Sequence, residues 1–189
     1  MAVTVLLVAL LAVATVTDLA QHKVYNWTTY PGILAALGLN ALGSLLAATT
    51  AVDPGTLESW GWIGISWSLF GLLACGGVLL VCFVLFKVGG GDVKLMAMMG
   101  AFLGLDQGII AMLWTFVLGG CLGLIVLVWR VGPWRLAVRT LRQVLWSLRL
   151  GSWSPLTPEE RAQLQPPLFL APSALAAAVI VQFSLIDWL

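Results

Sequence analysis

Residues 87–107 read KVGGGDVKLMAMMGAFLGLDQ, and the interpretation of this stretch decides the fold. Eleven apolar residues, 95–105, lie between a charged, glycine-rich segment and the pair Asp106-Gln107. Eleven residues of α-helix reach about 17 Å, whereas the hydrocarbon core of a bilayer is about 30 Å thick. The stretch can therefore cross a membrane only if its helix also includes residues 89–94 at one end and Asp106-Gln107 at the other.

The rest of the chain is equally apolar. Of 189 residues, 61% are hydrophobic and only 9% are charged, and the mean hydropathy is +1.03. Soluble domains carry about a quarter charged residues, so the composition excludes a water-soluble globular fold and a disordered chain. A net charge of +1 excludes a basic nucleic-acid-binding protein. The three cysteines lie singly in apolar runs, without the spacing of a zinc site or a disulfide framework.

Six apolar runs predict an all-α, polytopic membrane helix bundle. The five runs besides 95–105 are residues 1–17, 28–50, 60–86, 108–129 and 167–186. The first run lacks the basic segment of a secretory signal, so we expect it to be retained as a transmembrane helix. A polar insert, residues 130–166, precedes the last run, and we expect it to belong to a single domain formed by residues 1–189.

The distribution of charge supports six spans. With the N-terminus outside, the connections that fall inside contain His22 and all nine basic residues: Lys23, Lys87, Lys94, Arg130, Arg135, Arg139, Arg142, Arg149 and Arg161. The outer connections and the C-terminal end contain the acidic residues Asp53, Glu58, Asp106 and Asp187. This arrangement satisfies the positive-inside rule. Without a span at 95–105 the arginine-rich insert would lie outside, so we expect a multi-pass protein of the inner (plasma) membrane with an external N-terminus.

The insert contains a candidate amphipathic helix at residues 133–150. Its arginines recur at spacings of four, three and seven, and apolar side chains occupy another face. This pattern predicts an interfacial helix on the cytoplasmic leaflet. Simple membrane anchoring is one interpretation of this helix, and docking of a substrate or a partner protein is the other.

Two aspartates are the candidate functional groups. Asp18 ends the first apolar helix and Asp92 precedes the fourth, so both lie at the cytoplasmic end of a span. Because the fourth span is short, Asp92 is expected to lie within the depth of the bilayer. The run Gly89-Gly90-Gly91 is expected to let the backbone bend there, and irregular backbone in a membrane is tolerated only where it lines protein or water. Ionisable groups at such positions are costly and indicate function.

A pair of neighbouring carboxylates supports two kinds of chemistry. The two groups share a proton, so that one can take a proton from water while the other polarises a carbonyl, as in aspartic proteolysis. The same pair could bind a cation or relay protons in a small transporter or channel. A Ser-His-Asp site is excluded, since His22 is the only histidine, and the sequence shows no metal-ligand cluster. We therefore expect no metal and no organic cofactor.

Residues 89–95, GGGDVKL, have the form GxGDxKL. This motif resembles the signature of the type IV prepilin peptidases, which are GxGD-type intramembrane aspartyl proteases. The family's first motif places an aspartate at the end of the first helix and Ile-Pro-Asn eight residues later. Asp18 and Asn26 match this spacing, but Tyr25 replaces the proline, which indicates a different turn. The proline-rich segment 166–172 is similar to the start of the family's last helix.

The resemblance implies a membrane-embedded aspartic endopeptidase. Such an enzyme removes the basic leader of prepilins or pseudopilins at the cytoplasmic face, after a glycine that precedes a hydrophobic helix, for pilus or type II-like secretion assembly. Asp18 and Asp92 would be the catalytic pair, and Gly89 and Gly91 would shape the active-site turn. The possible supporting residues are Lys94 and Lys23, which either orient the carboxylates or anchor the protein to the membrane, and Asn26, which could cap a turn or helix.

One departure from the family limits what the resemblance implies. Bifunctional members carry a large cytoplasmic insert near the N-terminus with two CxxC pairs, associated with N-methylation of the processed pilin. Here the connection at residues 18–27 is too short for that insert, and the CxxC pairs are absent. The sequence therefore predicts a peptidase-only member without methyltransferase activity.

Overall fold

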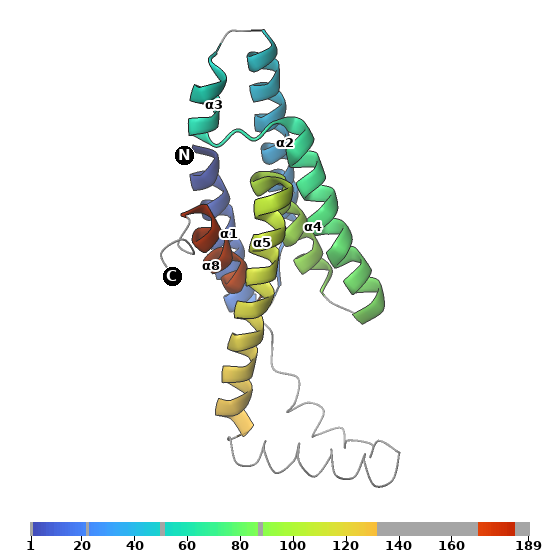
Figure 1. Cartoon of the computed structure of the whole chain (residues 1–189). Coiled ribbons are helices and arrows are strands. Elements are labelled where there is room, and N and C mark those ends of the chain that lie inside the picture. The colour runs from blue at the N-terminus through green and yellow to red at the C-terminus, as the bar shows by residue number, and fades with distance from the viewer. Residues whose placement is uncertain (1, 22, 50–51, 87–88, 132–169, 184–189) are drawn as a thin grey trace. The chain divides into compact units, whose positions relative to one another are not determined.

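The computed structural model describes residues 2–21, 23–49, 52–86, 89–131 and 170–183 (Figure 1). The regular structure of these residues is entirely helical. The chain divides into two compact units, residues 1–118 with 169–189, and residues 119–168. The first unit contains both Asp18 and Asp92.

Six helical elements are described, and they are α1 (Ala2–Gln21), α2 (Asn26–Ala48), α3 (Pro54–Trp60), α4 (Ile65–Phe86), α5 (Gly90–Val131) and α8 (Leu170–Gln182). Within the part of the chain that the structure describes, four segments are long and apolar enough to cross a membrane, at residues 2–21, 26–48, 55–85 and 90–129. The prediction of a polytopic membrane helix bundle is therefore confirmed. The two predicted spans within 90–131 are joined in α5 and separated by a break at Gly104, and α8 is described over 13 residues of the last predicted run.

That element, α5, is broken at Gly104. Gly104 has φ 79° and ψ −171°, a conformation that favours glycine, and it interrupts the helix. A Cβ atom on Gly108 would lie 3.2 Å from the Cα atom of Gly100, so the two halves fold back on each other. The first half begins at Gly90, five residues before the apolar run, as the sequence required for a span. It ends just before Gly104 rather than including Asp106-Gln107.

The interior face of α1 runs along one stripe of the helix. The buried residues of α1 are Thr4, Leu7, Leu11, Ala14 and Asp18, at alternating spacings of three and four. This spacing places all five side chains on one face. The helix packs against α8 and α2, with α8 alongside α1 in Figure 1. Asp18 therefore faces the interior of the bundle, on the same stripe as the core leucines.

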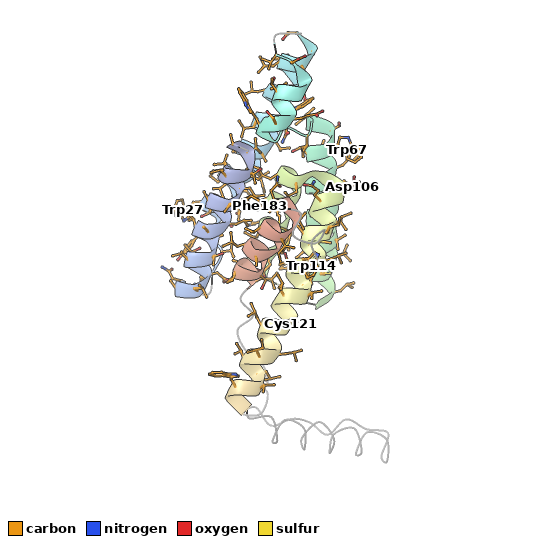
Figure 2. All side chains as sticks on the ribbon, turned by 60° about the vertical axis from the view of Figure 1, so that its left-hand side comes forward. Trp27, Trp67, Asp106, Trp114, Cys121 and Phe183 are labelled. Carbon is orange, nitrogen blue, oxygen red and sulfur yellow. The ribbon has the colours of Figure 1, made fainter. Side chains whose placement is uncertain are left out.

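The outer surface of the bundle is apolar. Large hydrophobic side chains such as Trp27, Leu34 and Phe183 have exposed fractions of 68%, 70% and 57%. Trp27 and Phe183 are labelled in Figure 2. Patches of this extent are unfavourable in water and are normal for a surface that faces lipid. The exposed side chains thus support the lipid bilayer as the surroundings of these helices.

Helices α4 and α5 cross with their backbones in close contact. A Cβ atom on Gly71 would overlap the carbonyl oxygen of Gly100 and would lie 2.5 Å from the carbonyl carbon of Gly104. At the same crossing, the hydroxyl of Ser68 donates a hydrogen bond of 2.6 Å to the carbonyl of Ala101. This carbonyl belongs to the last turn before Gly104, where helical partners run out. The crossing therefore fixes the first half of α5 on α4.

We expect Gly71→Ala to destabilise the protein. The added methyl group meets backbone atoms, which cannot move aside as a side chain can, so the helices must separate, at a cost of about 1–3 kcal/mol in the free energy of unfolding. Gly77→Ala in the same helix is the matched control, because nothing lies within 4 Å of its added Cβ atom and alanine favours a helix over glycine. Thermal unfolding in detergent measures both. Equal stability of the two variants would contradict this packing.

Some sequence predictions lie outside the described residues. These are the amphipathic helix at 133–150, nearly all of the insert 130–166, His22, Lys87, and the end of the last predicted run with Asp187.

Candidate functional site

The carboxyl group of Asp18 lies at the start of α8. Its exposed fraction is 7%, and its Oδ2 atom accepts a hydrogen bond of 3.2 Å from the backbone N–H of Ala171. Ala171 belongs to the first turn of α8, whose N–H groups have no partner within the helix. A helix N-terminus also favours a negative charge. Asp18 therefore connects the end of α1 to the beginning of α8.

Asp92 lies in the first turn of α5 and is half-buried. Its backbone N–H donates a hydrogen bond of 3.0 Å to the carbonyl of Gly89, which precedes the helix. The carboxyl groups of Asp18 and Asp92 are close enough to interact electrostatically. The two residues that the sequence analysis selected, 74 positions apart in the chain, are thus brought to the same end of the bundle.

The glycines beside Asp92 provide space rather than unusual backbone angles. Gly90 and Gly91 belong to the regular helix of α5, so the irregular backbone expected across the glycine run is not seen at these two positions. A Cβ atom on Gly89 would lie 2.8 Å from the Oδ2 atom of Asp92, and one on Gly91 would lie 3.0 Å from the Cβ atom of Val24. Side chains at 89 and 91 would therefore press on the carboxylate and on the α1–α2 connection.

Lys94 joins the beginnings of α2 and α5. Its Nζ atom donates a hydrogen bond of 2.8 Å to the Oδ1 atom of Asn26 and lies 4.9 Å from the centre of the Tyr30 ring. The N-cap residue of α2 is Tyr25, without a side-chain capping bond, so the role suggested for Asn26 as a cap is not seen. Lys23 is exposed on the connection between α1 and α2.

Tyr25 adopts a conformation close to that of the proline it replaces. Its φ and ψ angles are −81° and 139°, and proline holds φ near −65 ± 15°. The Tyr25 hydroxyl donates a hydrogen bond to Oε1 of Gln21, at the end of α1. The turn is therefore compatible with proline, and the different turn expected from this substitution is not required.

Three parts of this site were not predicted from the sequence. They are the N–H of Ala171, the close approach of Val24 to Gly91, and the ring of Tyr30. Tyr30 follows Asn26 by four residues, which places both on one face of α2, so this spacing could have indicated Tyr30. The other two are contacts between distant segments and have no local signal.

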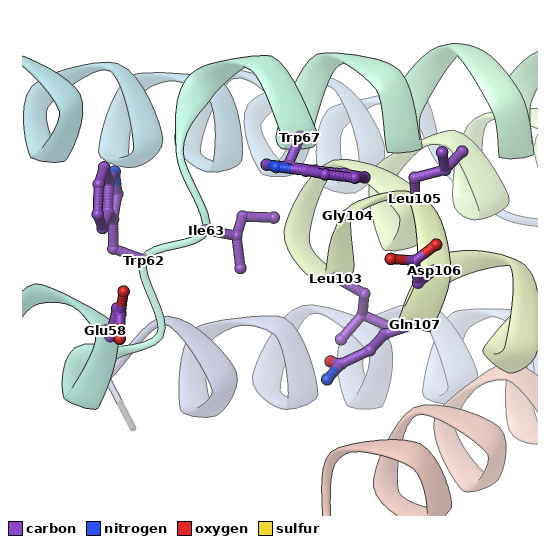
Figure 3. A pocket seen from close by; sticks show the side chains of 9 residues that line it. All are labelled: Glu58, Trp62, Ile63, Trp67, Leu103, Gly104, Leu105, Asp106 and Gln107. Atoms are coloured by element: carbon purple, nitrogen blue, oxygen red, sulfur yellow. The ribbon is translucent and has the colours of Figure 1, made fainter. Parts of the chain in front are cut away.

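A separate cavity lies at the other end of the bundle. It has a volume of about 310 Å³ and contains neither Asp18 nor Asp92 (Figure 3). Its lining residues are Glu58, Trp62, Ile63, Trp67, Leu103, Gly104, Leu105, Asp106 and Gln107. Glu58 and Asp106, predicted to lie outside the membrane, are thus on one side of the bundle. A smaller adjoining cavity includes Val3 and Thr4, at the opposite end of α1 from Asp18. We take Asp18 and Asp92 as the candidate site, because their carboxyl groups interact with each other and Asp18 is buried in the bundle.

The sequence was compared with family models, curated proteins and solved structures. The model of a family described as the type IV leader peptidase family matches residues 5–124, which is more than half of the chain. The matched range includes Asp18, Asn26, Asp92 and Lys94. No curated protein and no solved structure matches the chain. Within the described residues, no group of three or more His, Cys, Asp or Glu side chains could hold a metal ion.

Proposed function

The chain belongs to the type IV leader peptidase family, and on this basis we propose that it is an aspartic endopeptidase that removes the basic leader of prepilins or pseudopilins. The observation that carries the aspartic mechanism is the meeting of two carboxyl groups, Asp18 and Asp92, at one end of an apolar bundle. Family membership favours proteolysis over the cation or proton transport that the same pair could support.

The proposed chemistry uses one carboxyl group in each protonation state. The ionised group takes a proton from a water molecule, whose oxygen attacks the carbonyl carbon of the scissile peptide bond. The protonated group donates to the carbonyl oxygen as negative charge develops on it. As the tetrahedral intermediate collapses, its hydroxyl returns a proton to the carboxylate that had donated it, the carbonyl re-forms, the C–N bond breaks, and the leaving amine receives the proton taken from water. The products are the free leader carboxylate and the new N-terminus of the pilin.

The position of the pair suits a substrate that is half in the membrane. Asp18 lies in the last turn of α1 and Asp92 in the first turn of α5, so the pair is near one end of the bundle, where helices leave the bilayer. Lys23 and Lys94 lie at the same end, and the positive-inside rule assigns this end to the cytoplasm. A basic leader would then remain in the cytoplasm while the hydrophobic helix of the substrate stays in the bilayer.

A cleavage assay tests the proposal. The protein is co-expressed with candidate prepilins that carry a basic leader, a glycine and a hydrophobic helix, and leader loss is followed by mass spectrometry. We expect cleavage after the glycine, and none when a bulky residue replaces this glycine. Inserted, folded protein that cleaves no member of a broad prepilin panel would reject the proposal.

We expect Lys94→Ala to lower kcat/KM about three- to tenfold without abolishing cleavage. The substitution removes the hydrogen bond to Asn26 and the contact with Tyr30, which together hold the start of α5 against α2. Hydrogen bonds to charged groups contribute about 1.5–3 kcal/mol, and partial exposure lowers this value.

Asn26→Ala provides the comparison for Lys94→Ala, because it removes the acceptor of the same hydrogen bond. The double variant should be no worse than the poorer single variant if the two side chains act as one unit. Additive losses would show that they act separately, and complete loss in folded Lys94→Ala would assign Lys94 a direct part in the reaction.

A further inference from the structure

Thr28 has a buried hydroxyl group without a partner. Its exposed fraction is 3%, and its Oγ1 atom finds no hydrogen-bond acceptor or donor within the described part of the chain. Other buried hydroxyls of the bundle are bonded, for example Thr115 to the carbonyl of Ala111 at 2.7 Å and Ser68 to that of Ala101 at 2.6 Å. Buried polar groups are nearly always paired, so an exception calls for an explanation.

Thr28 lies in the first turn of α2. Serine and threonine in a helix bond to the carbonyl three or four residues earlier. For Thr28 these residues are Tyr25, the N-cap, and Val24, which precedes the helix. The carbonyl of Tyr25 accepts the backbone N–H groups of Thr28 at 3.2 Å and Thr29 at 3.4 Å, but the Thr28 hydroxyl is bonded to neither carbonyl.

The hydroxyl lies on the face of α2 that is turned toward α1 and α5. Thr28, Gly32 and Ala36 are four residues apart and all buried, which places them on one helix face. A Cβ atom on Gly32 would lie 3.2 Å from the Cδ1 atom of Leu10 in α1 and 3.1 Å from the Cγ atom of Met98 in α5. This face therefore looks toward the two helices that carry Asp18 and Asp92.

The contacts of α2 give its register against α5. Val24 is opposite Gly91, Asn26 is bonded to Lys94, and Gly32 is opposite Met98. Thr28 is then at the level of residue 95, about one helical turn beyond Asp92. These three residues of helix correspond to about 4.5 Å. Gly32 lies beside Leu10 of α1, so the four-residue step from Gly32 back to Thr28 corresponds to the step from Leu10 to Ala14, one turn before Asp18. Thr28 is thus one turn deeper in the bundle than the carboxylate pair.

We propose that the hydroxyl of Thr28 binds the main chain of the substrate just beyond the scissile bond. This inference rests on the proposed function. For a carboxylate pair to act on a peptide bond, the substrate must be unwound there, and the helix that follows then begins with backbone N–H groups that lack helical partners. In a membrane such groups need a partner. Thr28 lies one turn from the pair on the bilayer side, and because its hydroxyl is buried in the free protein, the entering substrate must part the packed helices to reach it.

Thr28→Val distinguishes a functional hydroxyl from a structural one. Valine keeps the shape and removes a group that is unsatisfied in the free protein, so stability should stay equal or rise. Activity should fall, with kcat/KM about tenfold lower, which corresponds to about 1.4 kcal/mol, and Thr28→Ser should recover most of it. The measurements are cleavage kinetics on a prepilin and thermal unfolding, both with the full-length protein in detergent.

Thr115→Val is the matched control with the opposite pattern. Thr115 is also buried, but its hydroxyl is bonded, so its loss should lower stability and leave cleavage unchanged. Unchanged cleavage in Thr28→Val would overturn the role of Thr28 while leaving the proposed peptidase intact, and so would a loss of activity that merely follows a loss of stability. Cleavage that persists in Asp18→Asn would instead reject the carboxylate pair, and the role of Thr28 with it.

Discussion

We expect Asp18→Asn and Asp92→Asn each to reduce kcat for leader cleavage roughly a thousandfold or more, to the background of the assay. Asparagine has nearly the shape of aspartate but can neither take a proton from water nor donate a carboxylic acid proton. General acid–base catalysis contributes about 10²–10⁴ in rate for each group. In Asp18→Asn the amide oxygen of the new side chain can still accept the N–H of Ala171, so the start of α8 should remain in place. Activity is measured by mass shift of a prepilin substrate, and insertion by membrane fractionation.

Glu58→Gln and Asp106→Asn are the controls for the loss of a carboxylate as such. Both residues line the cavity at the other end of the bundle, and both substitutions should leave cleavage unchanged. The two site variants should also insert and fold as the wild type does, because asparagine keeps nearly the shape of aspartate. Substantial cleavage by purified Asp18→Asn or Asp92→Asn would contradict the assignment of these two residues as the catalytic pair.

Much of the bundle could be predicted because membrane helices follow composition and charge. The break at Gly104 falls at the end of the short run 95–105, and the helix there begins at Gly90, which is one of the two extensions that a spanning segment required. The burial of Asp18 also had a local signal, since Leu7, Leu11 and Ala14 precede it at helical spacing. These features depend on residues close together in the sequence, where periodicity carries information.

Contacts between distant segments could not be predicted in this way. Ala171 is 153 residues from Asp18, and Lys94 is 68 residues from Asn26. The packing of the helices determines which N–H or carbonyl group a side chain contacts. The apolar stripes of the sequence specify this packing only approximately. The glycine run shows the same limit. The sequence suggested a bend there, whereas in the structure the glycines, which have no side chain, allow α5 and the α1–α2 connection to approach each other.

Gly89→Ala should lower kcat about a hundredfold with little change in stability. The added methyl group would lie 2.8 Å from the Oδ2 atom of Asp92, which is too close for two non-bonded atoms. The carboxylate is the end of a side chain, so it can rotate away, and the fold tolerates the substitution. The rotated carboxylate is then misplaced with respect to Asp18, and an error of about 1 Å in a reacting group can cost about a hundredfold in rate.

Gly90→Ala separates this effect from a general effect of alanine in the glycine run. A Cβ atom on Gly90 would lie 3.7 Å from the Cε2 atom of Phe83, an ordinary contact, and alanine in a helix is favoured over glycine by about 1 kcal/mol. This variant should keep full activity and unfold at a slightly higher temperature. If both variants were fully active, the space beside Gly89 would not limit the position of the Asp92 carboxylate. If both were inactive, the glycine run would act through the flexibility of the backbone, since only Gly89 has the carboxylate within reach of its added methyl group.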